Sequence, residues 1–292
     1  MDTHRLHEEL LEREVRVLVV GCGGNGSAIL TGLPYLHSAM LAQGHPYGLH
    51  VTVMDDDTVS PFNSVRQPFA KSEVGLNKAI VLVSRLNIFW GLSWQAIPQP
   101  FTAQTLAPSY AGYGEPHLRP DIVVGCVDTR AARAIIAEST AGFSGVSYWL
   151  DVGNSSSSGQ FVLGEPQNLR NKRSRMRLRT ISELYPEVTD PALDDDNEPS
   201  CSAIEALERQ EPFVNAVLAQ HALALLARLL RYGQISHHGG FVDIATSRSV
   251  PLAVDPSLWR RVRKQAANRR KGDPDLPEKQ NSSQREGGYK AP

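Results

Sequence analysis

Two cations and several polar residues follow the second strand-like run of this sequence at a spacing that suits phosphate chemistry. The segment begins at Asp57, contains Asn63 and Arg66, and continues to Lys78. When a nucleophile attacks the α-phosphorus of a nucleotide, negative charge builds on the pyrophosphate leaving group, and fixed cations stabilise it. Either cation alone is typical of a protein surface. Together, Arg66 and Lys78 predict a site that holds a triphosphate.

A glycine-rich turn lies upstream of these cations, directly after the apolar run 15–20. It contains Gly21, Gly23, Gly24 and Gly26. Glycine lets the backbone turn tightly and approach a ligand, and the helix start that follows offers free N–H groups to an anion. The turn therefore predicts phosphate binding, but by itself it fits NAD, FAD, S-adenosylmethionine or ATP equally.

Three acidic residues, Asp55, Asp56 and Asp57, end the second strand-like run, and Asp55 follows the run directly. Ligands of open α/β sheets bind at the carboxyl ends of strands, near the point where the strand order reverses. Asp55 is predicted to bind the ribose hydroxyls of a nucleotide, and the alternative is a solvated acidic turn. An inserted loop at residues 45–48 explains why Gly21 and Asp55 are farther apart than the roughly twenty residues usual in dinucleotide enzymes.

The three cysteines, Cys22, Cys126 and Cys201, are far apart in the sequence. An odd number of cysteines without a C-x-x-C pair indicates a reducing compartment and excludes a zinc site built from cysteines. Cys22 and Cys126 adjoin predicted strands and are expected to pack in the core. Cys201 precedes a predicted helix, where a reactive thiolate is favoured. The alternative is a small buried or capping residue beside Ser200 and Ser202.

These candidate residues require a sheet whose strands end at a common edge. Strand-like runs occur at residues 15–20, 49–54, 121–124, 147–152, 160–163, 241–244 and 250–254, with a weaker one at 93–97, and helical patterns at 25–42, 75–89, 130–138 and 204–232. Alternating strands and helices up to about residue 152 predict a largely parallel sheet, and the later paired strands predict an antiparallel extension. The predicted fold class is α/β, a Rossmann-like mixed, mainly parallel sheet with helices on both faces.

Three segments flank or interrupt the predicted domain, which spans residues 15–258. Residues 1–14 form an amphipathic segment, and about 166–203 form a long crossover loop in which a basic run at 170–179 precedes an acidic one. We expect this loop to be solvated, with its opposite charges balanced. Residues 264–292 are polar and rich in Lys, Arg, Pro and Gly, which predicts a disordered tail.

The overall composition argues against membrane and nucleic-acid partners. The chain has 30 Lys and Arg against 31 Asp and Glu, a net charge of −1, so it has no general excess of positive charge. The most apolar long run, residues 213–230, contains Asn215 and Arg228, which predicts a buried helix rather than a membrane span. Its apolar face exceeds what a sheet alone would cover and favours a homodimer. The N-terminus is unlike a secretion signal, so a cytoplasmic location is expected.

The order and spacing of several motifs resemble the ThiF/MoeB/ubiquitin-activating (E1-like) superfamily. The motifs are Gly-x-Gly-Gly-x-Gly from Gly21, Asp-x-Asp-Thr-Val from Asp55, Asn-x-x-Arg-Gln from Asn63, Gly-x-x-Lys-Ala from Gly75 and Cys-Val-Asp-Thr-Arg from Cys126. Within the superfamily, Pro199-Ser-Cys-Ser and the helix near Glu211 are most similar to the ThiF-type family of the plasmid-borne PRTRC cassette.

The resemblance implies ATP-dependent adenylation of the C-terminal carboxylate of a small ubiquitin-like or sulfur-carrier protein that ends in Gly-Gly. The catalytic residues it implies are Arg66, Lys78, Asp128, which would hold Mg²⁺, and Cys201, which would take the activated carboxylate as a thioester or take part in sulfur transfer. It also implies a homodimer. The residues implied to bind ATP are Gly21, Gly23, Gly24, Gly26, Asp55, Asp57, Asn63, Arg66, Gln67, Lys78, Asp128 and Thr129.

The sequence departs from the family pattern in three respects. No arginine-containing motif precedes the first strand, Thr129 stands where Asn is common, and the zinc-binding cysteine pairs are absent, so no zinc is expected.

Two functions other than adenylation are compatible with parts of the sequence. An NAD-dependent Rossmann oxidoreductase fits the glycine turn but leaves Arg66, Lys78 and Asp128 without a purpose. The other alternative is a non-catalytic nucleotide-binding scaffold on the same fold.

Overall fold

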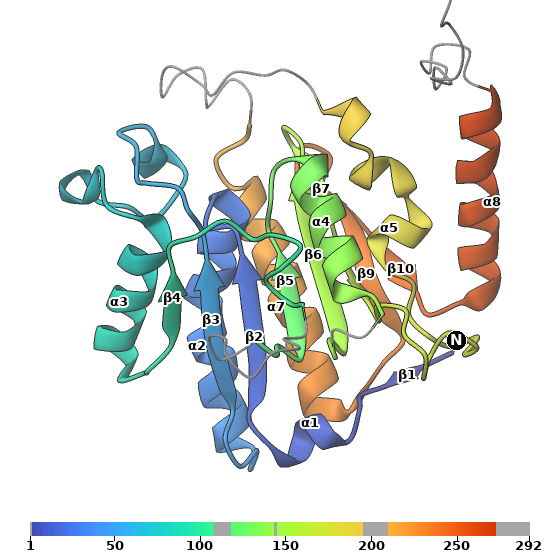
Figure 1. Cartoon of the computed structure of the whole chain (residues 1–292), viewed down its shortest axis with the longest axis horizontal. Helices are drawn as coiled ribbons and strands as arrows, with labels where there is room; N and C mark the ends of the chain where they lie inside the picture. Colours follow the sequence, from blue (N-terminus) through green and yellow to red (C-terminus); the bar gives the residue numbers. More distant parts are fainter. Residues whose placement is uncertain (1, 108–117, 143–144, 195–209, 273–292) are drawn as a thin grey trace, which may run out of the picture.

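The computed structural model describes residues 2–107, 118–142, 145–194 and 210–272. Its main sheet consists of β2 (Val15–Val20), β3 (Leu49–Met54), β4 (Gln95–Ile97), β5 (Ile122–Gly125), β6 (Tyr148–Asn154), β7 (Ser158–Gly164), β9 (His237–Asp243) and β10 (Arg248–Ala253). These form an eight-stranded sheet in the order β10-β9-β7-β6-β5-β2-β3-β4 (Figure 1).

The sheet is parallel over one part and antiparallel over the other. β6, β5, β2, β3 and β4 run parallel to one another, whereas β7, β9 and β10 add antiparallel strands beyond β6. Because β2 lies between β3 and β5, the strand order reverses beside β2, which is where open α/β sheets bind ligands. The structure confirms the predicted α/β class with a mixed, mainly parallel sheet.

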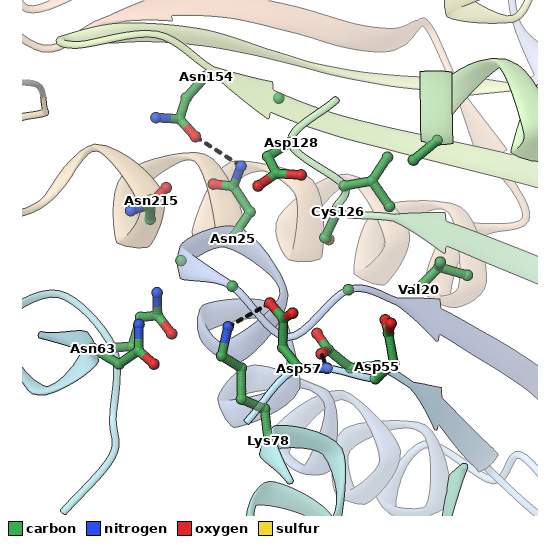
Figure 2. A pocket seen from close by; sticks show the side chains of 18 of the residues that line it. Val20, Asn25, Asp55, Asp57, Asn63, Lys78, Cys126, Asp128, Asn154 and Asn215 are labelled. Carbon is green, nitrogen blue, oxygen red and sulfur yellow. Dashed lines mark hydrogen bonds and ion pairs between the residues drawn. The ribbon is translucent and has the colours of Figure 1, made fainter. Parts of the chain in front are cut away.

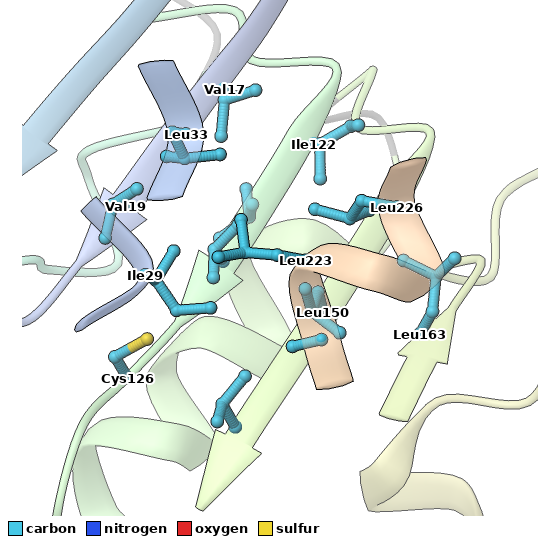
Figure 3. Packing of buried hydrophobic residues seen from close by; sticks show 14 of the residues in the cluster. Val17, Val19, Ile29, Leu33, Ile122, Cys126, Leu150, Leu163, Leu223 and Leu226 are labelled. Carbon is cyan, nitrogen blue, oxygen red and sulfur yellow. The ribbon is translucent and has the colours of Figure 1, made fainter. Parts of the chain in front are cut away.

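Helices cover both faces of this sheet. α2 (Gly24–Ala42) and α7 (Val214–Tyr232) pack against each other on one face, and α4 (Arg130–Thr140) lies on the other. Figure 3 shows Ile29 of α2 and Leu223 of α7 converging on buried side chains of the strands, such as Leu150. With apolar cover on both faces, the central strands read as almost continuous apolar runs rather than alternating ones.

The long helix α7 differs from its prediction in two ways. It begins at Val214, after a turn at residues 210–213, and the predicted start at 204–209 lies outside the described residues. Its apolar residues, including Leu218, Leu226 and Leu229, are buried against α2 and the sheet of the same chain. The expectation that this helix leaves an apolar face for a second copy is therefore wrong, and α7 provides no argument for a dimer.

The N-terminal segment is packed onto the domain. β1 (His4–Arg5) pairs with β8 (Gln234–Ile235), which follows α7, and α1 (Glu9–Glu12) comes next along the chain. Leu6 and Leu10 are buried, and the Leu6 N–H donates to the Gly233 carbonyl at 2.8 Å. The predicted amphipathic segment thus uses its apolar side to attach to the opposite end of the sheet from the glycine turn (Figure 1).

The predicted crossover loop contains short helical turns in its described part, at Ile181–Leu184 (α5), Pro186–Thr189 (η3) and Pro191–Leu193 (η4). The prediction of a solvated basic run is wrong at Arg177, whose side chain has 0 % exposure. Arg177 donates to the Glu183 carboxylate at 2.6 and 2.8 Å and to the Glu165 carbonyl at 2.7 Å. A buried charge needs such partners, so this arginine fastens the loop to the domain.

The Arg177–Glu183 pair leads to a pH-dependent prediction. Although burial raises the pKa of Glu183, the Arg177 hydrogen bonds and charge outweigh it, so the pKa lies below its ordinary value. A carboxyl with a depressed folded-state pKa contributes stability above its unfolded pKa and loses it as the pH falls through the folded value. We expect the free energy of unfolding to fall more steeply below about pH 4.5 in the wild type than in Glu183→Gln, measured by urea unfolding from pH 6 to 3. Parallel curves for the two proteins would contradict this.

The C-terminal end of the described chain is helical. α8 spans Pro256–Gly272, so the predicted absence of structure from Lys264 onward is wrong as far as Gly272. Trp259 anchors this helix because its buried indole Nε1–H donates to His238 Nε2 at 3.0 Å. The rest of the predicted tail, residues 273–292, lies outside the described residues. Within the described part of the chain, no helix is both long and apolar enough to cross a membrane.

Candidate functional site

A pocket of about 650 Å³ opens at the carboxyl ends of β2, β3, β5 and β6 (Figure 2). It lies at the reversal of strand order, where the topology predicts a ligand. Most of the predicted site residues line it, namely Gly21, Gly23, Gly24, Asp55, Asp57, Asn63, Arg66, Gln67, Lys78 and Asp128. Gly26 and Thr129 are not among its lining residues.

The glycines of the turn serve two different purposes. α2 begins at Gly24, and Gly23 at its N-cap provides no side-chain cap, so the first N–H groups of a 19-residue helix face the pocket uncapped. A Cβ on Gly23 would meet no atom within 4 Å, whereas a Cβ on Gly26 would lie 1.8 Å from the Gly21 carbonyl oxygen. Gly23 therefore leaves space on the pocket side, and Gly26 allows the turn to close.

Asp55 braces the glycine turn from the end of β3. Its carboxylate accepts hydrogen bonds from the Cys22 N–H and, at 2.8 Å, from the Asp57 N–H. Burial raises the pKa of Asp55, while these two backbone hydrogen bonds and the nearby Lys78 charge oppose the shift. The side chain thus couples the turn to the β3 end, and each oxygen retains capacity for a further donor.

Lys78 is held at the start of α3 (Lys78–Trp90) by the residue before it. The Asn77 side chain accepts from the Ile80 N–H at 3.0 Å and donates to the Asp55 and Asp57 carbonyls at 2.8 and 3.1 Å. This N-cap ties the helix start to the end of β3. The Lys78 ammonium, on a side chain 9 % exposed, pairs with the largely exposed Asp57 carboxylate at 2.8 Å. Lys78 is therefore a fixed cation of the pocket wall.

Arg66 reaches the same pocket from the short helix η1 (Asn63–Val65). The Asn63 side chain accepts from the Ser60 N–H at 2.7 Å and so shapes the turn that precedes Arg66. The guanidinium donates to the Gln210 side chain. Burial lowers the pKa of Arg66, yet a guanidinium stays charged in proteins. The neighbouring Gln67 has a buried Oε1 that lacks a hydrogen-bond partner within the described chain.

Asp128 and Thr129 lie beyond the end of β5 and have separate roles. Asp128 is exposed and lines the pocket. Thr129 is the N-cap of α4, and its hydroxyl accepts from the Ala132 N–H at 3.2 Å. The position of Thr129 is explained by capping the helix rather than by contact with the pocket.

The ThiF family model matches residues 6–258. The chain belongs to the ThiF family. No curated protein matches the chain.

Solved structures share the fold of this ThiF-family chain. PaaA aligns with a TM-score of 0.54 at 13% identity, covering 82% of this chain and 64% of PaaA. E. coli MccB in complex with MccA-N7isoASN gives 0.52 at 15% identity, with 82% and 64% covered, and E. coli MccB with ATP gives 0.50 at 15% identity, with 85% and 65% covered. The ThiF-family chain therefore spans under two thirds of the length of these proteins. At these identities, the likeness concerns the fold.

Three asparagines of the ThiF-family pocket were not predicted from the sequence. Asn25 Nδ2 donates to Asn154 Oδ1 at 2.9 Å, and both lie beside Asn215 in Figure 2. Asn25 Oδ1 and Asn215 Nδ2 are buried and have no hydrogen-bond partner in the described part of the chain. Unpaired buried amides are costly and call for a partner. A sequence signal existed for Asn25, the one residue other than glycine in 23–26, but none for the other two.

Arg133 is a further pocket residue that the sequence did not indicate. Its Nε donates to Asp151 Oδ1 at 2.7 Å, and its Nη2 donates to the Val127 carbonyl at 3.0 Å. Burial raises the pKa of Asp151, and the Arg133 charge and hydrogen bond oppose the shift. By holding the Val127 carbonyl, the pair fixes the turn that carries Asp128.

The described cysteines are packing residues, as predicted. Cys22 and Cys126 are buried, and burial is the main cause that raises the pKa of both thiols. Both stay protonated and are poor nucleophiles. Cys201, the predicted acceptor, lies outside the described residues.

Proposed function

We propose that this ThiF-family protein binds ATP and transfers its adenylyl group to a carboxylate of a second molecule. The proposal rests on the arrangement of one pocket, in which two cations flank the uncapped start of α2. Arg66 and Lys78 reach it from the β3 side, and Asp128 from the end of β5. Membership of the ThiF family favours this reaction over hydride transfer to NAD.

The pocket fits a nucleoside triphosphate by shape and by polarity. Its volume of about 650 Å³ lies within the range of about 300–1,000 Å³ usual for small-molecule sites. Two kinds of hydrogen-bond donor are available to an anion, namely the free N–H groups of α2 and the unpaired Asn215 Nδ2. The open space beside Gly23 leaves room for the anion. Titration with ATP and with NAD, followed calorimetrically, should give binding for ATP alone.

The chain's own residues account for the expected steps. A carboxylate oxygen attacks the α-phosphorus, the bond from that phosphorus to the pyrophosphate oxygen breaks, and pyrophosphate leaves with its charge. Arg66 and Lys78 are placed to stabilise that leaving charge, a contribution of the kind that electrostatic preorganisation makes to catalysis. Holding the carboxylate in line replaces a bimolecular encounter. Asp55 is assigned to the ribose.

Asp128 is the residue we propose as the Mg²⁺ ligand. An exposed carboxylate at the pocket wall is a hard oxygen donor of the type Mg²⁺ prefers, usually together with phosphate oxygens. The ion would neutralise phosphate charge. We expect Asp128→Asn to lower ATP–pyrophosphate exchange by about 10²-fold and to raise the Mg²⁺ concentration that gives half-maximal rate. Thr129→Ser, which retains the α4 cap, is the control. Unchanged Mg²⁺ dependence in Asp128→Asn would remove the assignment.

The acceptor we propose is the C-terminal glycine of a small ubiquitin-like or sulfur-carrier protein ending in Gly-Gly. The family resemblance of the motifs supports this. E. coli MccB, solved with ATP and with MccA-N7isoASN, supports only the coarser proposal that a second molecule is used besides the nucleotide. The resemblance likewise supports a cytoplasmic homodimer and membership of the PRTRC-type family.

Cys201 is proposed to take the activated carboxylate as a thioester. The thiolate attacks the adenylated carbonyl carbon, and AMP leaves as the thioester bond forms. We expect gel electrophoresis without reductant to show a conjugate of the two proteins that thiol treatment cleaves. It should be absent in Cys201→Ser and present in Cys22→Ser. A thiol-sensitive conjugate in Cys201→Ser would contradict the role.

A further inference from the structure

A second cluster of ligand-type side chains lies at the other end of the sheet from the ATP pocket. It consists of His4 on β1, His7 two residues beyond that strand, and Glu165, which directly follows β7. Figure 1 shows β1 below the sheet, whereas the glycine turn and the start of α2 lie toward its upper edge. None of the three residues lines the proposed ATP pocket.

Donor atoms of these three residues lie close to one another. His7 Nε2 lies 2.9 Å from Glu165 Oε1, and His4 Nδ1 lies 3.6 Å from Glu165 Oε2. One ligand atom from each residue lies within 4.8 Å of the others. Tetrahedral Zn²⁺ with bonds of about 2.0–2.1 Å places its ligand atoms about 3.3–3.4 Å apart. The two measured distances end on different oxygens of Glu165 and differ from this separation by up to about half an ångström. Binding through one shared oxygen would therefore require one imidazole to move toward that oxygen.

The surroundings hold the ligands in the orientation that a metal requires. His4 Nε2 hydrogen-bonds the Tyr148 hydroxyl at 2.9 Å, which leaves Nδ1 to face Glu165. Glu165 Oε2 accepts from the Leu178 N–H at 2.8 Å, and this fixes the carboxylate. Outer hydrogen bonds of this kind to a histidine's second nitrogen and to a ligating carboxylate are a regular feature of metal sites.

We propose that His4, His7 and Glu165 form a binding site for a divalent transition-metal ion, with Zn²⁺ as the best match. Two imidazole nitrogens and one carboxylate oxygen are a three-ligand set of the type that zinc takes with water in the fourth position. His4 and Glu165 are buried, whereas the His7 side chain is 37% exposed, so the fourth position and the entry path lie on the His7 side.

The site would act as a clamp on the N-terminal segment. β1 is only two residues long and is held by its pairing with β8. An ion bound to His4 and His7 would join this segment to the end of β7 through Glu165. Metal affinity would then appear as folding stability. The proposal needs no cysteine and does not depend on the proposed ATP chemistry.

Zinc binding by the tag-free full chain tests the proposal directly. We expect one equivalent of Zn²⁺ to be withdrawn from a chromogenic chelator, and Co²⁺ to give the visible absorption of a tetrahedral site. His7→Ala and Glu165→Gln should each weaken binding by about 10–100-fold or more. In the wild type, Zn²⁺ should also raise the melting temperature. His50→Ala, which removes a histidine of β3 outside the cluster, should bind as the wild type does.

Fold retention separates loss of a ligand from loss of structure. The partly exposed His7 should tolerate alanine, so its variant should keep the far-UV circular dichroism and cooperative unfolding of the wild type. Equal Zn²⁺ affinity of the wild type, His7→Ala and Glu165→Gln would overturn the proposal, as would absence of stoichiometric binding by the wild type. Either result would leave His4, His7 and Glu165 as a hydrogen-bonded network only.

Discussion

Lys78→Met is expected to lower ATP–pyrophosphate exchange by about 10²–10³-fold, the loss typical of removing one fixed group that stabilises transition-state charge. The methionine retains an apolar stem of similar length, so the buried start of α3 should still pack. The ammonium that faces the pocket would be missing. Because the lost interaction strengthens as the leaving group gains charge, we expect kcat to fall more than ATP affinity. Steady-state exchange and calorimetric ATP titration measure the two effects.

Lys71→Met provides the matched control for this variant. Lys71 lies in the nearby short helix η2 (Lys71–Glu73), is exposed and does not line the pocket. The Lys71→Met variant should catalyse ATP–pyrophosphate exchange at the wild-type rate. That result would exclude a general effect of losing a positive charge. If Lys78→Met also exchanged within about twofold of the wild type while remaining folded, Lys78 would have no part in stabilising the leaving group.

Alanine at Gly26 should lower the stability of the fold, whereas alanine at Gly23 should leave stability unchanged and weaken ATP binding. A Cβ at Gly26 would be 1.8 Å from the Gly21 carbonyl oxygen, a backbone atom that cannot move without opening the turn. We expect Gly26→Ala to lose about 3 kcal/mol or more of stability, at the upper end of overpacking effects.

A Cβ at Gly23 would meet no atom within 4 Å. The free energy of unfolding of Gly23→Ala should therefore lie within about 0.5 kcal/mol of the wild-type value.

The ATP affinity of Gly23→Ala shows whether Gly23 faces the bound nucleotide. If a phosphate binds at the start of α2, the Cβ of Gly23→Ala would occupy the same space. This overlap should cost about 1–3 kcal/mol of binding free energy and so weaken ATP binding about 5–150-fold. Urea unfolding and calorimetric titration measure the two quantities. If Gly23→Ala bound ATP as tightly as the wild type, the phosphates would not lie at this turn.

Local patterns in the sequence were sufficient to predict the sheet and most of the pocket. The apolar run Val15–Val20, the glycines after it and Asp55 each signal their own structure within a few residues. Asp128 was placed in the site by the family resemblance of its motif. Parallel strands, whose carboxyl ends meet at one edge, explain how it comes to share a pocket with Lys78, although the two are far apart in the chain. The structure places both in the pocket wall.

Features that depend on tertiary packing were not predicted. Arg177 is one of several basic residues in its run, and only the position of Glu183 across the loop makes it the buried one. Asn215 becomes a pocket residue because α7 packs beside α2. Helix α8 carries so few apolar residues that its composition indicates disorder, yet the contact of Trp259 with His238 anchors its first turn.

Pyrophosphate exchange into ATP is the most direct measurement of the central claim. The protein is mixed with Mg-ATP, labelled pyrophosphate and a small ubiquitin-like protein that ends in Gly-Gly. The same acceptor without its last glycine serves as the control. Adenylation at the α-phosphorus predicts label in ATP with the intact acceptor and none with the truncated one. ATP binding without exchange in the presence of the intact acceptor would contradict the account and would indicate a nucleotide-binding scaffold.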